Sequence, residues 1–92
     1  MWLWLTATAK ARATPQTIAA KRHLWLSQGK DQQLRARCRS AQRYVVEPSD
    51  PSRVFWLLDT DDPTTAQLIT DHFGDLWEIE VCRVSPQAIG RS

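Results

Sequence analysis

Residues 54–63 read Val-Phe-Trp-Leu-Leu-Asp-Thr-Asp-Asp-Pro, a bulky apolar run that stops at a group of carboxylates and a proline. The apolar part has the composition of a buried strand. Asp62 can cap a helix by accepting hydrogen bonds from its free N–H groups, and Pro63 suits the first helical position because its missing N–H is not needed there. The stretch therefore predicts a strand that ends at Asp59 and a helix that begins at Pro63.

The residues that follow predict how this helix ends. It is expected to run to Phe73 and Gly74, where glycine can take the left-handed conformation that ends many helices. A new strand is predicted from Trp77 to Val84, where apolar and acidic residues alternate. Strand, helix and strand thus follow one another directly.

The N-terminal half predicts a similar unit. Residues 2–9 alternate large and small side chains, which is typical of a central strand. Thr14 and Pro15 repeat the combination of a cap and a proline, and the helix that they start is expected to stop at Gly29.

The middle of the chain connects the two units. Residues 30–33 are predicted to form a polar linker, and residues 35–47 a long second strand that is bent or bulged. Residues 48–52 have the composition of a turn. The segment after residue 84 is predicted either to cover an edge of the sheet or to be loose.

The predicted order of elements is βαββαβ in a single domain that spans residues 1–92. Right-handed crossovers and antiparallel neighbours make this a ferredoxin-like α+β sandwich, with a four-stranded antiparallel sheet and two helices on one face. The other face is open unless something else covers it. A chain this short buries a limited fraction of its apolar surface, so oligomerisation is a common way to bury more.

The net charge of +2 combines a basic half with an acidic half. Residues 1–46 carry nine Lys or Arg and one acidic residue, whereas residues 47–92 carry three Arg and nine acidic residues. Such asymmetry can indicate an anionic partner, or two halves that complement each other within one fold or across a dimer. Because the whole molecule is nearly neutral, we favour complementary halves.

The cysteines and histidines predict no metal site. Cys38 and Cys82 are far apart and have no zinc-ligand spacing with His23 or His72. Two lone cysteines without an export signal indicate small buried side chains in a reducing compartment, so a cytoplasmic protein is expected. The apolar start of the chain is too short to span a membrane, so no membrane insertion is expected. No cofactor is predicted.

Charged residues suggest a contact between subunits. Arg35, Arg37, Arg39 and Arg43 share one parity of the predicted second strand, and Glu78 and Glu80 share one face of the last. These strands lie at opposite edges of a ferredoxin-like sheet, so the two rows could pair only across a dimer. The alternative is two solvated charged edges that discourage aggregation.

Five tryptophans are many for this length. They can fill a small core, form a subunit interface or line an apolar ligand cavity. The residues expected at such an interface or ligand site are Trp2, Trp4, Thr6, Tyr44 and Trp56.

Three sequence runs carry a resemblance to a known family. They are FWLLDTDDP, HFGDLWEIEV and the earlier RYVVEPSD. Together they resemble small uncharacterised proteins of the dimeric α+β barrel superfamily, often grouped as muconolactone-isomerase-like, over residues 44–84. The resemblance implies the fold and a homodimer but no settled activity. Family members often have a proline near the end of the last strand, where this chain has Arg83.

The residues that could act as general acids, bases or nucleophiles form no catalytic pattern in the sequence. A protein without catalytic activity is therefore favoured, and no catalytic residue is predicted. His72 lies in the last turn of a predicted helix, where the helix dipole favours a positive imidazole, and His23 is expected to be exposed. Neither has a nearby nucleophile. The expected function is that of a dimeric interaction module, small-ligand-binding module or accessory subunit of a larger assembly, with a small apolar ligand as a possible partner.

Two other functions remain open at this stage. The first is a cofactor-free isomerase or oxygenase, which a ferredoxin-like fold can support. The second is an RNA-binding module, because the arginines and the βαββαβ order are shared with RNA-recognition domains. Nucleic acid is the less favoured partner because the third strand lacks a glycine-containing motif and Glu78 and Glu80 would repel phosphate.

Overall fold

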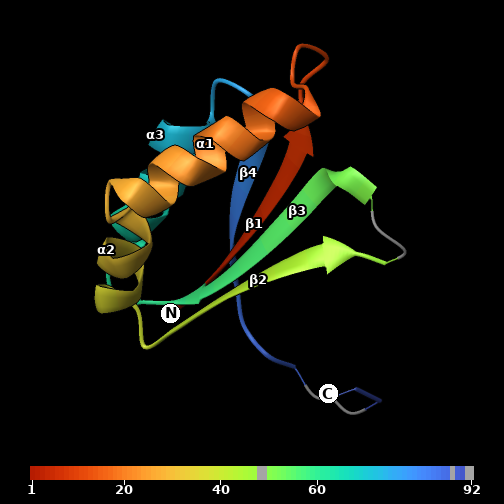
Figure 1. The fold of residues 1–92 in the computed structure, drawn as a ribbon. Helices are drawn as coiled ribbons and strands as arrows, with labels where there is room; N and C mark the ends of the chain where they lie inside the picture. Colours follow the sequence, from red (N-terminus) through yellow and green to blue (C-terminus); the bar gives the residue numbers. More distant parts are fainter. Residues whose placement is uncertain (48–49, 88, 91–92) are drawn as a thin grey trace.

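The computed structural model describes residues 1–47, 50–87 and 89–90 (Figure 1). The elements in chain order are β1 (Trp2–Ala9), α1 (Pro15–Ser27), α2 (Lys30–Ala36), β2 (Ser40–Val46), β3 (Asp50–Asp59), the 3₁₀ helix η1 (Pro63–Ala66), α3 (Gln67–Phe73) and β4 (Trp77–Val84). The helices lie together on one side of the sheet.

The four strands form one sheet in the order β2-β3-β1-β4, and every neighbouring pair is antiparallel. This order places the first and third strands in the centre and the second and fourth at the edges. It confirms the predicted ferredoxin-like α+β fold with a four-stranded antiparallel sheet.

The segment that joins β3 to η1 confirms the predicted cap. The carboxylate of Asp62 accepts a hydrogen bond from the Thr64 N–H at 2.9 Å, and Pro63 occupies the first helical turn. Buried Thr60 holds this segment in place, because its hydroxyl donates to the Arg37 carbonyl at 2.8 Å. Its backbone also exchanges hydrogen bonds with Met1. The connection is therefore fixed to both the central strand and the segment before β2.

The start of α1 is also as predicted. Thr14 accepts a hydrogen bond from the backbone of Thr17, and the Thr17 hydroxyl accepts one from the backbone of Thr14, so the two form a capping box. The helix ends before Gly29, whose φ of 71° lies in the left-handed region. Glycine at this position permits the sharp change of direction into the next helix.

The predicted path of the chain between Gly29 and β2 is wrong. Residues 30–36 form helix α2 rather than a linker and the start of a strand, and β2 begins only at Ser40. Leu34 is buried from this helix, and Asp31 pairs with Arg35 one turn later at 3.2 Å. Burial of one apolar side chain and this pair favour a helix where the alternating arginines suggested a strand.

Residues 50–52 belong to strand β3 and not to the turn predicted at residues 48–52. Residues 48–49 lie outside the described residues, and β3 already begins at Asp50. The pairing of β2 with β3 is irregular between Val45 and Val46, which agrees with the predicted bulge in the second strand.

Gly74 ends α3 for a different reason than predicted. Its φ is −67°, so the left-handed conformation is not used. A Cβ atom at this position would lie 2.4 Å from the carbonyl oxygen of Thr70, a distance that real Cβ atoms do not adopt. Glycine is needed here because the backbone passes so close to the preceding turn.

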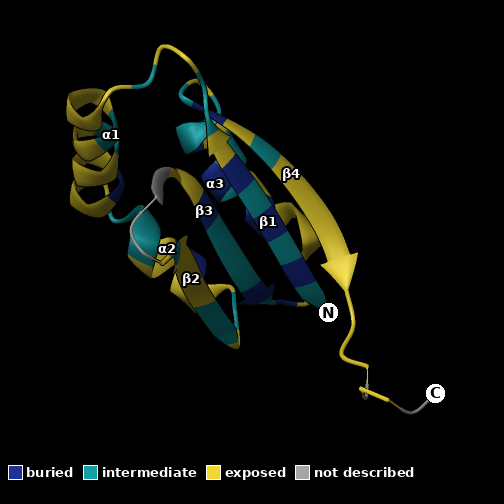
Figure 2. Cartoon of the chain, turned by 90° about the vertical axis from the view of Figure 1, so that its right-hand side faces the viewer, coloured by how far each residue is buried: buried dark blue, intermediate teal, exposed yellow. Residues whose placement is uncertain are grey.

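The two faces of the sheet have different environments. Leu3, Leu5 and Ala7 alternate along β1 toward the helices and are buried, together with Leu58 and Trp77 of the neighbouring strands. The alternate residues of β1 are only partly buried, and β4 is largely exposed (Figure 2). We call the side away from the helices the open face. No described residue of the chain forms a layer over it.

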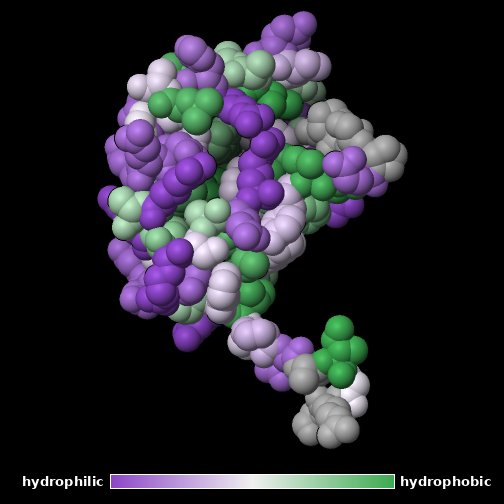
Figure 3. All heavy atoms as spheres, turned by 60° about the horizontal axis from the view of Figure 1, so that its bottom comes forward, coloured by the Kyte–Doolittle hydropathy of each residue, from purple (hydrophilic) through white to green (hydrophobic). Residues whose placement is uncertain are grey.

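The chain after β4 leaves the body of the molecule as an extended arm (Figures 1 and 2). Ile89 in this arm is fully exposed, and Figure 3 shows hydrophobic atoms on the arm that nothing covers in that view. The described part of the arm does not cover an edge of the sheet. In the part of the chain that the structure describes, no helix is long and apolar enough to cross a membrane.

Candidate functional site

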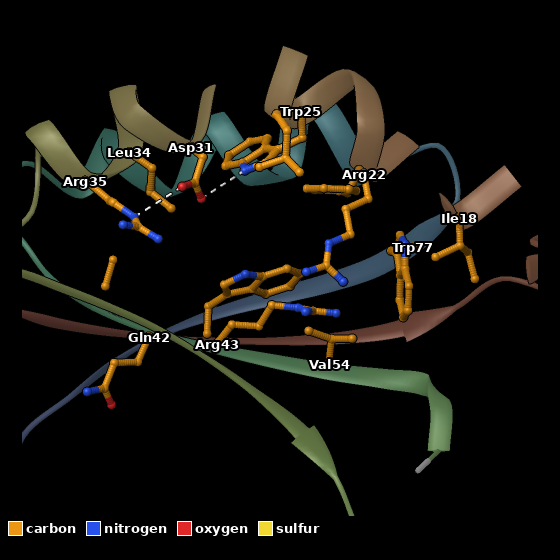
Figure 4. Close-up of a pocket in the computed structure, with 14 residues that line it drawn as sticks. Ile18, Arg22, Trp25, Asp31, Leu34, Arg35, Gln42, Arg43, Val54 and Trp77 are labelled. Atoms are coloured by element: carbon orange, nitrogen blue, oxygen red, sulfur yellow. Dashed lines mark hydrogen bonds and ion pairs between the residues drawn. The ribbon is translucent and has the colours of Figure 1, made fainter. Parts of the chain in front are cut away.

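A cavity of about 310 Å³ lies between the helices and the sheet (Figure 4). We call it the helix–sheet cavity. Its size falls at the lower end of the range of about 300–1,000 Å³ that is typical of small-molecule sites. It is the strongest candidate for a functional site among the described residues, because aromatic and charged side chains meet there.

Helix α1 contributes one face to this cavity. Ile18, Arg22 and Trp25 follow one another at spacings of four and three residues, so they lie on the same side of the helix. Trp25 is buried. The apolar ends of this face pack toward the sheet, and Arg22 extends between them into the cavity.

Helix α2 forms the adjoining wall. Asp31 accepts a hydrogen bond from the indole Nε1 of Trp25 at 3.4 Å with one oxygen, and its other oxygen pairs with Arg35 Nε at 3.2 Å. Leu34 closes the wall between them and is buried. The carboxylate therefore ties α1 to α2 while it remains at the cavity surface.

The sheet contributes the floor. Arg43 of β2 and Trp56 of β3 lie opposite each other in the strand register, and both point toward the helices. Val54 and Trp77 line the floor further along. Burial lowers the pKa of Arg43, and the positive charge of Arg22 lowers it further.

Aromatic rings surround the cavity. Phe73 of α3 lies between the ring of Trp25, 5.3 Å away, and the ring of Trp56, 6.1 Å away, measured between centroids. Trp77 completes a set of four aromatic lining residues. Such a wall offers flat apolar surfaces that suit a planar aromatic molecule.

The aromatic residues predicted at the interface or ligand site separate into two places. Trp56 lines the helix–sheet cavity. Trp2, Trp4 and Thr6 lie on the open face, because they alternate with the buried residues of β1, and Tyr44 lies there on β2. The five residues therefore do not form one site.

The open face carries its own aromatic cluster. The ring centroid of Trp4 lies 5.5 Å from that of Phe55 and 6.0 Å from that of Tyr44. The guanidinium of Arg53 lies 5.6 Å from the centroid of Phe55. Tyr44 is exposed and the other rings are half-buried, so the cluster presents apolar surface to its surroundings.

The predicted row of arginines along the second strand is not formed. Arg35 belongs to α2, and Arg37 follows it directly as the C-cap. Arg43 is in β2, but it faces the helices. The prediction that these arginines share a strand face is wrong because the chain is helical where alternation suggested a strand.

Arg39 instead holds a loop within the same chain. Its guanidinium pairs with Asp59 at 3.0 Å and with Asp61 at 2.8 Å. The hydrogen bonds that Arg39 donates to Asp61 and Asp59 raise its pKa, and the same contact with the guanidinium lowers the pKa of Asp61. Glu78 and Glu80 do lie on the open face as predicted, opposite Thr8 and Thr6 of β1.

The histidines lie away from the helix–sheet cavity. His23 is exposed, as predicted. His72 lies in the last turn of α3, where its Nδ1 is 2.9 Å from Lys30 Nζ and its Nε2 is 2.8 Å from the Lys21 carbonyl oxygen. An ammonium can only donate, so Nδ1 accepts and Nε2–H donates to the carbonyl. This arrangement requires a neutral imidazole and differs from the positive one expected from the helix dipole.

The cysteines are less buried than predicted. Cys38 is half-buried, whereas Cys82 is exposed on the open face. Burial, and to a lesser degree the charge of Asp59, raises the pKa of the Cys38 thiol. Neither thiol lines the helix–sheet cavity.

Several residues of the helix–sheet cavity were absent from the sequence-based prediction, namely Arg22, Trp25 and Asp31. The spacing of Ile18, Arg22 and Trp25 on one helical face was available as a signal. It was not specific, because the same spacing is typical of any helix that packs on a core.

Comparison with known proteins identifies relatives in structure only. No protein-family model and no curated protein matches the chain. Its structure is similar to that of a protein from Deinococcus radiodurans that is provisionally described as an antibiotic biosynthesis monooxygenase. The TM-score is 0.52 at 15% identity, and the alignment covers 100% of this chain and 99% of that one.

Two further solved structures are similar to the chain. One is described as an antibiotic biosynthesis monooxygenase, with a TM-score of 0.52 at 13% identity, covering 94% of this chain and 100% of that one. The other is a conserved protein from Methanosarcina mazei Go1, with a TM-score of 0.52 at 17% identity, covering 92% and 94%. At these identities the similarity shows the ferredoxin-like fold, while the expected muconolactone-isomerase-like grouping is not confirmed.

Proposed function

We propose that this protein binds a planar aromatic molecule in the helix–sheet cavity and oxygenates it without a cofactor. The observation that carries the proposal is the set of four aromatic rings, Trp25, Trp56, Phe73 and Trp77, around one cavity of about 310 Å³. The names of two similar structures support oxygenation as the reaction.

The chemistry of such a reaction balances without an added reductant. A monooxygenase transfers one atom of O₂ to its substrate and reduces the other to water. A ring-activated CH₂ group can supply all four electrons, because its conversion to C=O by one O₂ releases one H₂O. The protein would need to bind the substrate, accept a proton from it and stabilise the resulting anion.

Asp31 is the residue that we assign as the proton acceptor. It is the only carboxylate among the described residues that line the cavity, and no histidine lines it. Its contacts with Trp25 and Arg35 hold the carboxylate at the cavity wall. The carboxylate of Asp31 is therefore already in position to act as a base. When it accepts the proton of the substrate, one of its oxygens must release or share its contact with Trp25 or Arg35.

The test is oxygen consumption by the full-length chain with a polycyclic phenol that carries a ring-activated CH₂ group. We expect uptake above the buffer rate and one ¹⁸O atom from ¹⁸O₂ in the product. Asp31→Asn should lower the rate at least tenfold, and Glu80→Gln on the open face should leave it unchanged. Uptake no faster than in buffer would rule out the oxygenase.

A second candidate is a binding module without catalysis. It is favoured by the engagement of Asp31 with both Trp25 and Arg35, which leaves no free base among the described lining residues. Calorimetric binding of the same phenol together with its unchanged recovery would favour this candidate over the oxygenase.

We also propose that the protein forms a homodimer through its open face. Trp4, Phe55 and Tyr44 form a partly exposed aromatic cluster there, and a second copy would remove its apolar surface from water. Glu78 and Glu80 on the same face disfavour a nucleic acid as the occupant. The four arginines do not share a strand face, so the proposed dimer does not include their pairing with these glutamates.

A further inference from the structure

The charges inside the helix–sheet cavity do not balance. Its described lining residues include Arg22, Arg35 and Arg43 but only one carboxylate, Asp31. Asp31 already pairs with Arg35 at 3.2 Å. Arg22 and Arg43 form no ion pair or hydrogen bond with any described residue. Both arginines are exposed residues, so two guanidiniums without a described partner line the cavity where a ligand can reach them.

These two arginines approach each other from opposite walls. Arg22 descends from α1, while Arg43 extends along the sheet, and Figure 4 shows their guanidiniums directed toward the same part of the cavity. The positive charge of Arg22 also contributes to the lowered pKa of Arg43. Two like charges directed toward one part of a cavity repel each other, and an anion between them would offset that repulsion.

We propose that Arg22 and Arg43 form an anion subsite, and that the ligand of the helix–sheet cavity is a planar aromatic acid whose carboxylate lies between them. This inference rests on the proposed binding of an aromatic molecule in the same cavity. A guanidinium presents parallel N–H groups that match the two oxygens of a carboxylate. The ring system of the acid would then extend toward Trp56 and Trp77, the aromatic residues of the floor.

A neutral aromatic ligand fits this arrangement less well. It would remove water from two guanidiniums without giving them an acceptor, and leaving a charged donor unsatisfied costs binding free energy. Asp31 would also repel a carboxylate placed at its own end of the cavity. The carboxylate of the ligand is therefore favoured between Arg22 and Arg43 and disfavoured next to Asp31. This preference fixes the orientation of the ligand in the cavity.

Calorimetric titration of the full-length chain with 2-naphthoate and with its neutral analogue 2-naphthamide tests the inference. We expect 2-naphthoate to bind at least tenfold more tightly, with an advantage that falls as salt rises. Arg22→Gln and Arg43→Gln should each weaken 2-naphthoate binding about tenfold and leave 2-naphthamide binding unchanged. Arg35→Gln is the matched control, because this arginine lines the same cavity but is already paired.

The outcomes separate this inference from the proposed function. Equal affinity for the two compounds, or equal effects of the Arg35 and Arg43 substitutions, would overturn the anion subsite while leaving an aromatic cavity. Failure of both compounds to bind would overturn both proposals. Circular dichroism of each variant establishes that it folds before its affinity is compared.

Discussion

Nδ1 of His72 lies 2.9 Å from Nζ of Lys30, and the opposite ring nitrogen lies 2.8 Å from the carbonyl oxygen of Lys21. One buried imidazole thus joins α3 to both α1 and α2. These two contacts of His72 hold the helices that cover the helix–sheet cavity to one another. Apolar packing around Trp25 and Phe73 contributes as well.

His72→Phe should lower the free energy of unfolding by about 1–3 kcal/mol, because the ring volume is kept while both hydrogen bonds are lost. Urea denaturation measures this change. His23→Gln is the control, and since His23 is exposed it should change stability by less than about 0.5 kcal/mol. Equal stability of the His72 variant and the wild type would show that the imidazole does not hold the helices.

The two glycines that flank helices should differ in how they respond to asparagine and alanine. Gly29 has a φ of 71° and open space around it, so Asn should cost less than Ala there, because Asn tolerates the left-handed region. At Gly74 any Cβ meets the Thr70 carbonyl oxygen at 2.4 Å, so both substitutions should destabilise, by about 1–3 kcal/mol. Thermal unfolding of the four variants checks the order. An Asn variant at Gly29 that is no more stable than the Ala variant, or a Gly74 variant as stable as the wild type, would contradict the structure.

The open face should determine the oligomeric state. Trp4→Glu places a charge at the centre of the aromatic cluster, so it should convert the proposed dimer into a folded monomer. Native mass spectrometry gives the mass, and circular dichroism checks the fold. His23→Glu, at an exposed position of α1 on the other side of the sheet, should leave the dimer intact. A monomeric wild type, or a dimeric Trp4→Glu variant, would remove the proposal.

Acid should weaken the fold through identifiable carboxylates. A hydrogen bond from Lys21 lowers the pKa of Asp75, and one from Arg39 lowers the pKa of Asp61. Because the folded pKa lies below the unfolded one, each contribution is complete above about pH 4 and is lost as the pH falls through the folded pKa. Asp75→Asn should therefore flatten the loss of stability below about pH 4. Asp71→Asn is the control for the loss of one negative charge, because this side chain forms no ion pair with a described residue. Equal flattening by both substitutions would contradict the role of Asp75.

Much of the fold follows from local signals in the sequence. Two helix starts are marked by a capping residue followed by proline, namely Asp62 with Pro63 and Thr14 with Pro15. Each cap bonds a residue only two or three positions further along, so these helices could be predicted without knowing the rest of the chain. Helix α2 could not be predicted in this way. It has seven residues, and Arg35 near its end begins an alternation of arginines that has the period of a strand. Only the burial of Leu34 in the folded molecule distinguishes a helix from a strand here.

The helix–sheet cavity was less predictable than the fold because it depends on contacts between distant elements. The sequence correctly marked Trp56 as a residue of interest, but the side of the sheet that it faces depends on the register of β3 against β1. The approach of Arg22 to Arg43 depends in turn on how α1 crosses that sheet. Amino-acid composition alone predicts neither the side of the sheet that Trp56 faces nor the approach of Arg22 to Arg43.

The division of the tryptophans between the two sides of the sheet gives the molecule two separate optical reporters. Trp25, Trp56 and Trp77 line the helix–sheet cavity, while Trp2 and Trp4 lie on the open face. Indole emission depends on the polarity around the ring and on quenching groups in contact with it. A ligand in the cavity and a protein on the open face would therefore alter different components of the intrinsic fluorescence, and the spectrum of one unlabelled sample carries information on both events.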